Sequence, residues 1–79
     1  MLQFELRAFP NEAMGPEDRT FVQAPSDQAI RARAGRLAVR INGPVDIARA
    51  GGSDWNDRYL TTASPSEFHA AGYRFERLT

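Results

Sequence analysis

The stretch of this sequence whose residue types best suit a protein–protein interface is the polar loop SDWNDRY. It holds the only tryptophan of the chain, Trp55, between Asp54 and Asp57, and Arg58 and Tyr59 follow directly. Trp, Tyr and Arg are the residue types enriched at the energetic centres of protein interfaces. If Trp55 is exposed, the loop marks a partner surface; if Trp55 folds back over a sheet, it closes one end of a small core. The sequence leaves these two interpretations open.

A second candidate contact surface is the basic side of a predicted helix. Arg33, Arg36 and Arg40 recur at i, i+3 and i+7, which places them on one flank of a helix, and Arg31 lies on the opposite flank. One interpretation is a solvated face whose aliphatic stems cover apolar surface. The other is a contact patch for an anionic surface of a protein or, with less support, of a nucleic acid. The predicted partner-binding residues are Arg33, Arg36, Arg40, Asp54, Trp55, Asp57, Arg58 and Tyr59.

Catalytic chemistry would have to rest on His69, the only histidine. A general base needs a nucleophile or a carboxylate positioned beside it. Ser66 and Glu67 are close in sequence, but residues three and two positions away do not form a catalytic arrangement by themselves. We therefore interpret His69 as structural and predict that the protein is not an enzyme.

Metal and cofactor sites also lack a sequence signature. The chain has no cysteine and one histidine, and its carboxylates are scattered without ligand spacing. Asp54 and Asp57 lack the alternating acidic ligands and the terminal glutamate of a calcium loop. The sequence contains neither a P-loop nor a dinucleotide fingerprint, and Gly51-Gly52 indicates a turn. We expect no metal and no cofactor.

The element that must position the basic flank is a helix predicted over residues 26–42. Ser26 is placed to cap its start, Asp27 lies in the first turn, and Asn42-Gly43 followed by Pro44 predicts its end. Its apolar residues follow the spacing of one helical face, which suits packing on a sheet. They are Ile30, Ala34, Leu37, Ala38 and Ile41.

Gly35 leaves an alternative open for this helix. A glycine inside a helix costs about 1 kcal/mol relative to alanine, so Gly35 either permits close packing or ends the helix early. If the helix ends early, RLAVRI and PVDIARA form a hairpin, because Asn-Gly between apolar runs is a strong hairpin signal. The Pro44 after this turn and the spacing from Ile30 to Ile41 favour the long helix.

Short strands account for most of the remaining chain. Leu2, Phe4 and Leu6 alternate with polar residues, which indicates a half-buried strand. Further strands are predicted at 19–24, 44–50, 58–62 and 73–78, and a surface loop is predicted at 11–18. Ser64 and Glu67 match a capping box, which predicts a short helix at 65–71.

These elements predict a single α+β domain over residues 1–79. Four or five short, mainly antiparallel strands pack on helix 26–42, with the short helix at 65–71, and the strand–helix–strand order suggests a crossover within one sheet. The predicted core is Phe4, Leu6, Phe21, Ile30, Ala34, Leu37, Ile41, Val45, Ile47, Leu60, Phe68, Tyr73 and Phe75.

Composition excludes several classes of protein. The formal net charge is zero, which argues against a strong nonspecific nucleic-acid binder and against a polyanionic DNA mimic. All ten basic residues are arginine, and with abundant alanine this indicates a GC-rich bacterial or phage genome. The first residues, MLQFELRAFP, lack the basic start and continuous apolar run of a signal peptide, so we expect none, and no apolar segment approaches roughly 20 residues. We expect a cytoplasmic protein of a bacterial host that does not bind membranes.

The layout of these elements resembles that of small anti-CRISPR proteins carried by phages and mobile elements. The likeness covers VQAPSDQAIRARAGRLAVRI, GPVDIARA and RYLTT; it is architectural and carries no motif. It implies a non-enzymatic inhibitor that binds a bacterial CRISPR–Cas surveillance complex and blocks it sterically, with the basic flank and the loop as contacts. The alternative is a small regulatory or structural domain that forms homodimers through a sheet edge or exposed aromatic residues.

Overall fold

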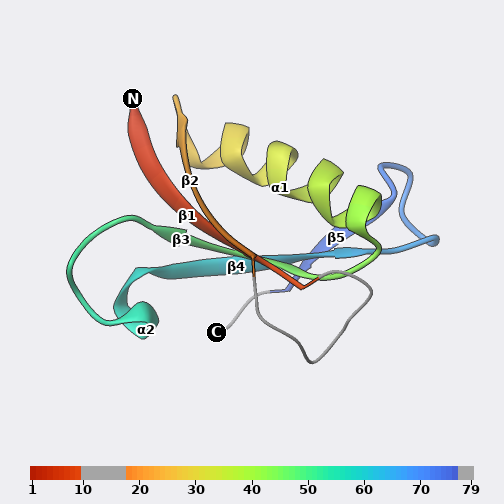
Figure 1. Ribbon diagram of the computed structural model, residues 1–79. Helices are drawn as coiled ribbons and strands as arrows, with labels where there is room; N and C mark the ends of the chain where they lie inside the picture. Colours follow the sequence, from red (N-terminus) through yellow and green to blue (C-terminus); the bar gives the residue numbers. More distant parts are fainter. Residues whose placement is uncertain (10–17, 77–79) are drawn as a thin grey trace.

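The part of the chain that the structure describes folds into an antiparallel sheet of five strands with one long helix on one face (Figure 1). The computed structural model describes residues 1–9 and 18–76. The strands are β1 (Leu2–Ala8), β2 (Asp18–Ala24), β3 (Val45–Arg49), β4 (Tyr59–Pro65) and β5 (Tyr73–Glu76), and the helices are α1 (Asp27–Ile41) and α2 (Trp55–Arg58). The predicted α+β class is therefore confirmed.

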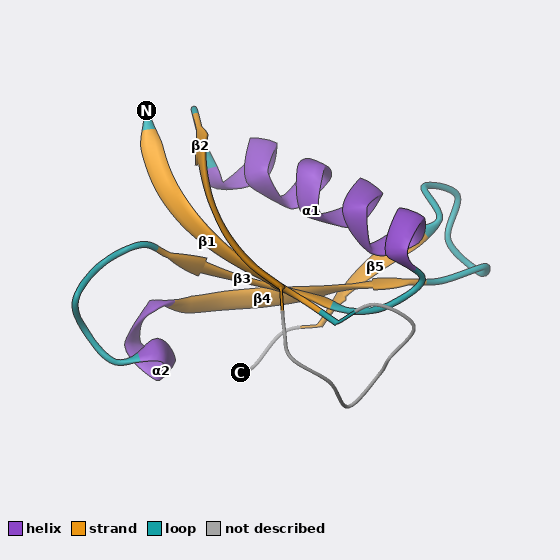
Figure 2. Cartoon of the chain, viewed as in Figure 1, coloured by secondary structure: helices purple, strands orange, loops and turns teal. Residues whose placement is uncertain are grey.

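The strands are arranged in the order β2-β1-β3-β4-β5, and each pairs antiparallel with its neighbours (Figure 2). Since β2 and β3 both run opposite to β1, they are parallel to one another with β1 between them. Helix α1 connects them, so the predicted crossover is present. The two edges of the sheet are β2 and β5.

The hydrophobic core lies between α1 and the sheet. Phe4, Ile30 and Ile47 are fully buried. The other buried members are Leu6, Ala8, Ala24, Ala34, Ala38, Val45 and Ala63. Leu37, Ile41, Leu60 and Phe75 are partly buried against this cluster. The predicted core is thus largely confirmed, and its small size follows from the many alanines that fill it.

Phe21 and Phe68 are the two predicted core residues that the structure places outside the core. Phe21 is 58% exposed and pairs with Glu5 in the register of β1 and β2, so it lies on the face away from α1. Val22 packs against the core in its place. Phe68 is 90% exposed in the connection between β4 and β5. The period-2 pattern identified the strand, but its pairing with β1 determined which face is buried.

The ends of α1 agree with the prediction. The Ala29 N–H donates to Ser26 Oγ at 3.1 Å, as expected for an N-cap. Asn42 adopts the left-handed conformation (φ 54°, ψ 49°), and the Gly43 N–H donates to the Ala38 carbonyl at 3.2 Å. The helix predicted over 26–42 is therefore confirmed, with its two outermost residues as caps.

Gly35 allows the ring of Tyr73 to lie directly on α1. A Cβ at position 35 would lie 2.3 Å from two ring carbons of Tyr73, far closer than van der Waals contact. The glycine thus permits close packing, and the alternative hairpin about Asn42-Gly43 is wrong. The half-buried Tyr73 also contacts Phe75 edge-on, with ring centroids 5.5 Å apart.

Replacing Gly35 with alanine is expected to destabilise the domain although alanine is the better helix former. The new methyl group forces Tyr73 out of place, and overpacking of this kind costs about 1–3 kcal/mol. Urea unfolding measures the change. Gly52→Ala is the control, because no atom lies within 4 Å of a Cβ there. A Gly35→Ala variant as stable as the wild type would contradict this packing.

The short helix predicted at 65–71 is wrong. Ser64 and Pro65 belong to β4, and residues 66–72 connect β4 to β5. The Ser66 N–H donates to the Gly72 carbonyl at 2.9 Å and closes this connection, with Gly72 at φ 87°. The pairing of β4 with β5 therefore outweighs the local capping signal. The short helix of the fold is α2, in the stretch predicted as a loop.

Two further predicted ranges fall partly outside the described residues. Of the loop predicted at 11–18, only Asp18 lies within the described residues, and β2 begins there. The last two residues of the strand predicted at 73–78 lie outside the described residues, and β5 is described to Glu76.

Candidate functional site

The two predicted groups of partner-binding residues lie on opposite faces of the sheet. Arg33, Arg36 and Arg40 are exposed on α1. The stretch Asp54–Tyr59 carries α2 and lies against the other face (Figure 1). Trp55 contacts Arg7 of β1 there. Because Arg7 directly follows the core residue Leu6 in β1, its side chain points to the face away from the core. One flat interface therefore cannot include both groups.

Beneath the Asp54–Tyr59 stretch, Glu5 is the centre of a buried ion cluster that the sequence analysis did not single out. Glu5 is only 3% exposed. Its Oε1 accepts a hydrogen bond from Nη1 of Arg58 at 3.0 Å, and its Oε2 accepts one from Nε of Arg7 at 3.1 Å. Nε of Arg19 also lies 3.1 Å from Oε2. The carboxylate thus links β1 to β2 and to α2.

The ion cluster also sets the protonation state of Glu5. Burial alone would raise the pKa of Glu5, because desolvation disfavours the charged form. Hydrogen bonds from Arg58 and Arg7, with the charges of Arg7 and Arg19, outweigh that effect and hold the pKa below its ordinary value. Glu5 is therefore a carboxylate at neutral pH, with its charge compensated inside the protein.

Trp55 is half-buried against the sheet face opposite the core. The guanidinium of Arg7 lies 3.7 Å from the centroid of its ring, in cation–π geometry, and that of Arg58 lies 5.7 Å away. The Tyr59 ring is 6.0 Å away and tilted. Of the two interpretations left open, the structure favours the one in which Trp55 folds back over the sheet, although it covers the face away from the core.

The remaining loop residues divide between structural and exposed positions. Arg58 donates from Nε to the Ser53 carbonyl and from Nη1 to the Arg49 carbonyl and to Glu5, so its guanidinium is held inside the protein. Asp54 and Asp57 are exposed at the rim. Together with the exposed Asn56, these two carboxylates are therefore the polar groups of this stretch left open to a partner.

A polar chain on the same face joins β3 to β4. Thr62 Oγ1 donates to Asp46 Oδ1 at 2.6 Å, and the Tyr59 hydroxyl contacts Thr62 Oγ1. A register shift between Ile47 and Ala48 places Tyr59 opposite Ala48 and allows this contact. Each of the three polar side chains has a partner within the chain, so the group stabilises the sheet rather than offering free ligands.

Arg33, Arg36 and Arg40, here called the arginine flank, differ from the other arginines of the described residues. None of the three makes a hydrogen bond, an ion pair or a ring contact with a described residue. By contrast, Arg49 pairs with Asp27 at 3.2 Å and Arg74 pairs with Glu76 at 3.4 Å. The flank therefore presents positive charge that no described residue compensates, on the one side of α1 that its helical spacing predicted.

A hollow of about 240 Å³ lies between the arginine flank and the edge of the sheet. It forms because α1 packs chiefly over β3 and β4 and covers β2 less. We call it the edge groove; its lining is Leu6, Thr20, Val22, Arg33, Leu37 and Arg40. The groove combines an apolar floor with two of the unpaired guanidinium groups.

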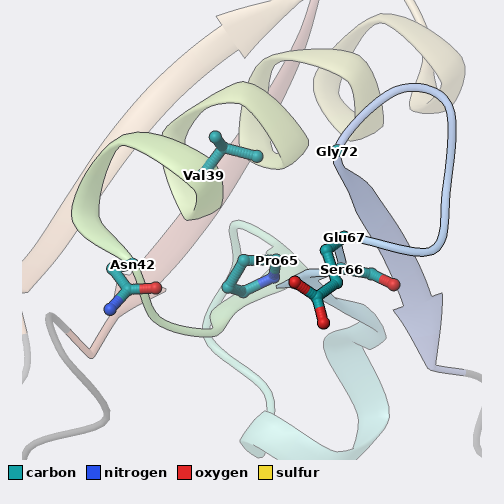
Figure 3. Close-up of a pocket in the computed structure, with 6 residues that line it drawn as sticks. All are labelled: Val39, Asn42, Pro65, Ser66, Glu67 and Gly72. Atoms are coloured by element: carbon teal, nitrogen blue, oxygen red, sulfur yellow. The ribbon is translucent and has the colours of Figure 1, made fainter.

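A second, wider hollow of about 440 Å³ lies between the end of α1 and the connection from β4 to β5 (Figure 3). Its lining is Val39, Asn42, Pro65, Ser66, Glu67 and Gly72. Glu67 is the only charged group of this lining and is exposed. The mixture of one carboxylate, small polar groups and Val39 does not define a ligand class.

His69 lies in the same connection and does not form a catalytic arrangement with the described residues. Its Nδ1 is 2.8 Å from the hydroxyl of Ser66, and both residues are close to solvent. No described carboxylate contacts the ring to orient it as a general base would require. Residues 1–9 and 18–76 also contain no group of three His, Asp or Glu that could hold a metal ion.

Comparisons with known proteins do not assign a family. No protein family, curated protein or solved structure matches this chain. Neither helix of the described residues has the length and apolar character needed to cross a lipid bilayer.

Proposed function

We propose that this chain is a non-enzymatic protein-binding domain that acts by occupying the surface of a larger partner through the arginine flank. The observation that supports this proposal most directly is that Arg33, Arg36 and Arg40 are exposed and have no partner among the described residues. Guanidinium groups are planar and weakly hydrated, which favours their burial at interfaces against carboxylates. Three of them on one rigid helix present a preorganised contact for an acidic surface.

The proposed partner class is a bacterial CRISPR–Cas surveillance complex, which this domain would inhibit by steric occlusion. Support comes from the resemblance in size and layout to anti-CRISPR proteins. The net charge of zero further favours local occlusion over mimicry of DNA. The exposed carboxylates of Asp54 and Asp57 lie on the other face and provide a secondary contact for a partner that extends around the domain.

Reversing one charge of the arginine flank is expected to weaken partner binding strongly. Tagged wild-type protein should capture a large ribonucleoprotein from lysate that contains CRISPR effector complexes, and Arg36→Glu should recover at least about tenfold less, a change of roughly 1.4 kcal/mol. Arg74→Glu is the matched control, because Arg74 is exposed on β5 away from the flank. Circular dichroism checks that both variants are folded. Equal capture by both variants would contradict the assignment of the flank.

The alternative function is self-association through the sheet edge. The observation that favours it is the edge strand β2, which is seven residues long and exposes Phe21. Sedimentation equilibrium at increasing concentration distinguishes the two functions. A wild-type dimer that becomes monomeric in Phe21→Glu, together with no captured partner, would favour the homodimer.

A further inference from the structure

The edge groove lies beside a strand edge that can accept another strand. Among the described residues, no strand pairs with the outer edge of β2. Natural edge strands are usually short, charged or interrupted by proline, which prevents unwanted pairing. The opposite edge, β5, has four residues and carries Arg74 and Glu76. The two charged residues of β2, Asp18 and Arg19, lie at its start, and residues 20–24 carry neither charge nor proline, so this part of the edge is the less protected one.

A segment added to β2 would direct alternate side chains toward α1. Within residues 20–24, the side chains of β2 on that face are Thr20, Val22 and Ala24, opposite Leu6, Phe4 and Leu2 of β1. Apolar side chains of the added segment would cover Val22 and Leu37 on the groove floor, both only partly buried. Backbone pairing and floor contacts together require an extended polypeptide.

The groove also selects the charge of the segment. Arg33 and Arg40 line it and are seven residues apart, so they lie about 10 Å apart along the helix axis. Carboxylates two or four positions apart on one side of an extended chain are separated by about 7 or 13 Å. Flexible arginine side chains can meet either spacing. An acidic, alternating segment therefore matches both the shape and the charge.

We propose that the edge groove and the outer edge of β2 bind an extended acidic segment of the partner protein, which adds to the sheet as a further strand. This inference rests on the proposed function and names the chemistry of the partner. A second copy of the chain fits less well, because residues 20–24 of its β2 include no carboxylate. A nucleic acid has no backbone that completes a β-ladder.

The test uses a fluorescein-labelled peptide in which Glu, Val and Glu occupy alternate positions with Thr between them. The expected result is saturable binding, seen as a rise in fluorescence anisotropy. A peptide with Lys in place of Glu, and one with a methylated backbone, should each bind at least about tenfold more weakly. In addition, β2 amides that exchange quickly with solvent in the free protein should become protected when the acidic peptide binds.

A matched pair of variants locates the binding. Thr20→Lys places a cationic side chain in the groove, and Gln23→Lys makes the same charge change on the same strand but on the opposite face. Both residues are exposed, so both variants should fold. The first should weaken peptide binding by at least about tenfold, and the second should leave it within about twofold.

Several outcomes would overturn this inference. Equal effects of the two variants would show that the peptide does not occupy the groove. Protection of β2 amides without peptide, together with a dimer in sedimentation, would assign the edge to a second copy. Tighter binding of an oligonucleotide than of the acidic peptide would assign the flank to nucleic acid. If Thr20→Lys still captures the effector complex while Arg36→Glu does not, strand addition fails and the proposed function stands.

Discussion

The Glu5→Gln variant should lose about 3 kcal/mol of its free energy of unfolding. The side chain of Glu5 is only 4% exposed and accepts charge-assisted hydrogen bonds from Arg7 and Arg58, with Arg19 also in contact. A neutral amide cannot compensate these guanidinium groups, and its N–H₂ group would face donors. Urea unfolding at pH 7 measures the change.

The control for Glu5→Gln is Glu76→Gln, which also removes the acidic partner of an arginine. Glu76 and Arg74 are about half-exposed, at 53% and 48%, and exposed pairs contribute at most about 1 kcal/mol. Equal losses in the two variants would show that Glu5 is not the buried centre of a cluster.

The contribution of Glu5 should also depend on pH. Its pKa in the folded state lies below the ordinary value of 4.5, so the folded state binds this proton less readily than the unfolded state does. The stabilisation is therefore complete above the unfolded pKa and is lost as pH falls through the lowered folded pKa. Unfolding followed from pH 7 downward should show a loss below about pH 4.5 in the wild type that is smaller in Glu5→Gln. Identical pH profiles would contradict this prediction.

The second large effect is expected for Phe4→Ala, with a loss of about 3–5 kcal/mol. Phe4 is fully buried on β1, between the sheet and α1, and the substitution leaves a cavity in a core otherwise rich in alanine. A domain of this size has a total stability of about 5–15 kcal/mol, so the loss is a large fraction. The midpoint of chemical unfolding measures it.

Phe21→Ala is the matched control, because it tests which face of the sheet is buried against α1. Phe21 is 58% exposed on the face away from α1, so its truncation should cost less than about 1 kcal/mol. If Phe4→Ala does not fold, the milder Phe4→Leu still gives a measurable loss. A greater loss for Phe21→Ala than for Phe4→Ala would reverse the assignment of the two faces.

Local signals predicted α1 because its ends depend on neighbouring residues. Ser26 and Asn42 cap the helix through hydrogen bonds to residues at most four positions away. The capping box at Ser64 failed for the opposite reason: pairing with β5 placed Ser64 and Pro65 in a strand. Tertiary pairing of this kind cannot be inferred from a local motif.

The candidate site likewise has one part that the sequence predicts and other parts that depend on tertiary structure. The arginine flank follows from helical spacing alone and could be predicted. The Glu5 cluster could not, because it needs Arg58, which is 53 residues away in sequence, and Arg19 from the neighbouring strand. A glutamate within an alternating strand indicates only a polar face. The edge groove also depends on how α1 crosses the sheet, which no sequence period specifies.

The most direct test of the central claim is site-specific photo-cross-linking in a bacterial host with an active CRISPR–Cas system. Benzoylphenylalanine replaces Val39, which is exposed on α1 beside Arg36 and Arg40, or, separately, Asn56, which is exposed on α2 at the opposite face. We predict an adduct with a subunit of the effector complex from position 39, in clearly higher yield than from position 56 beside the secondary contact. An adduct from position 56 alone, or one only with a second copy of the chain, would contradict the account.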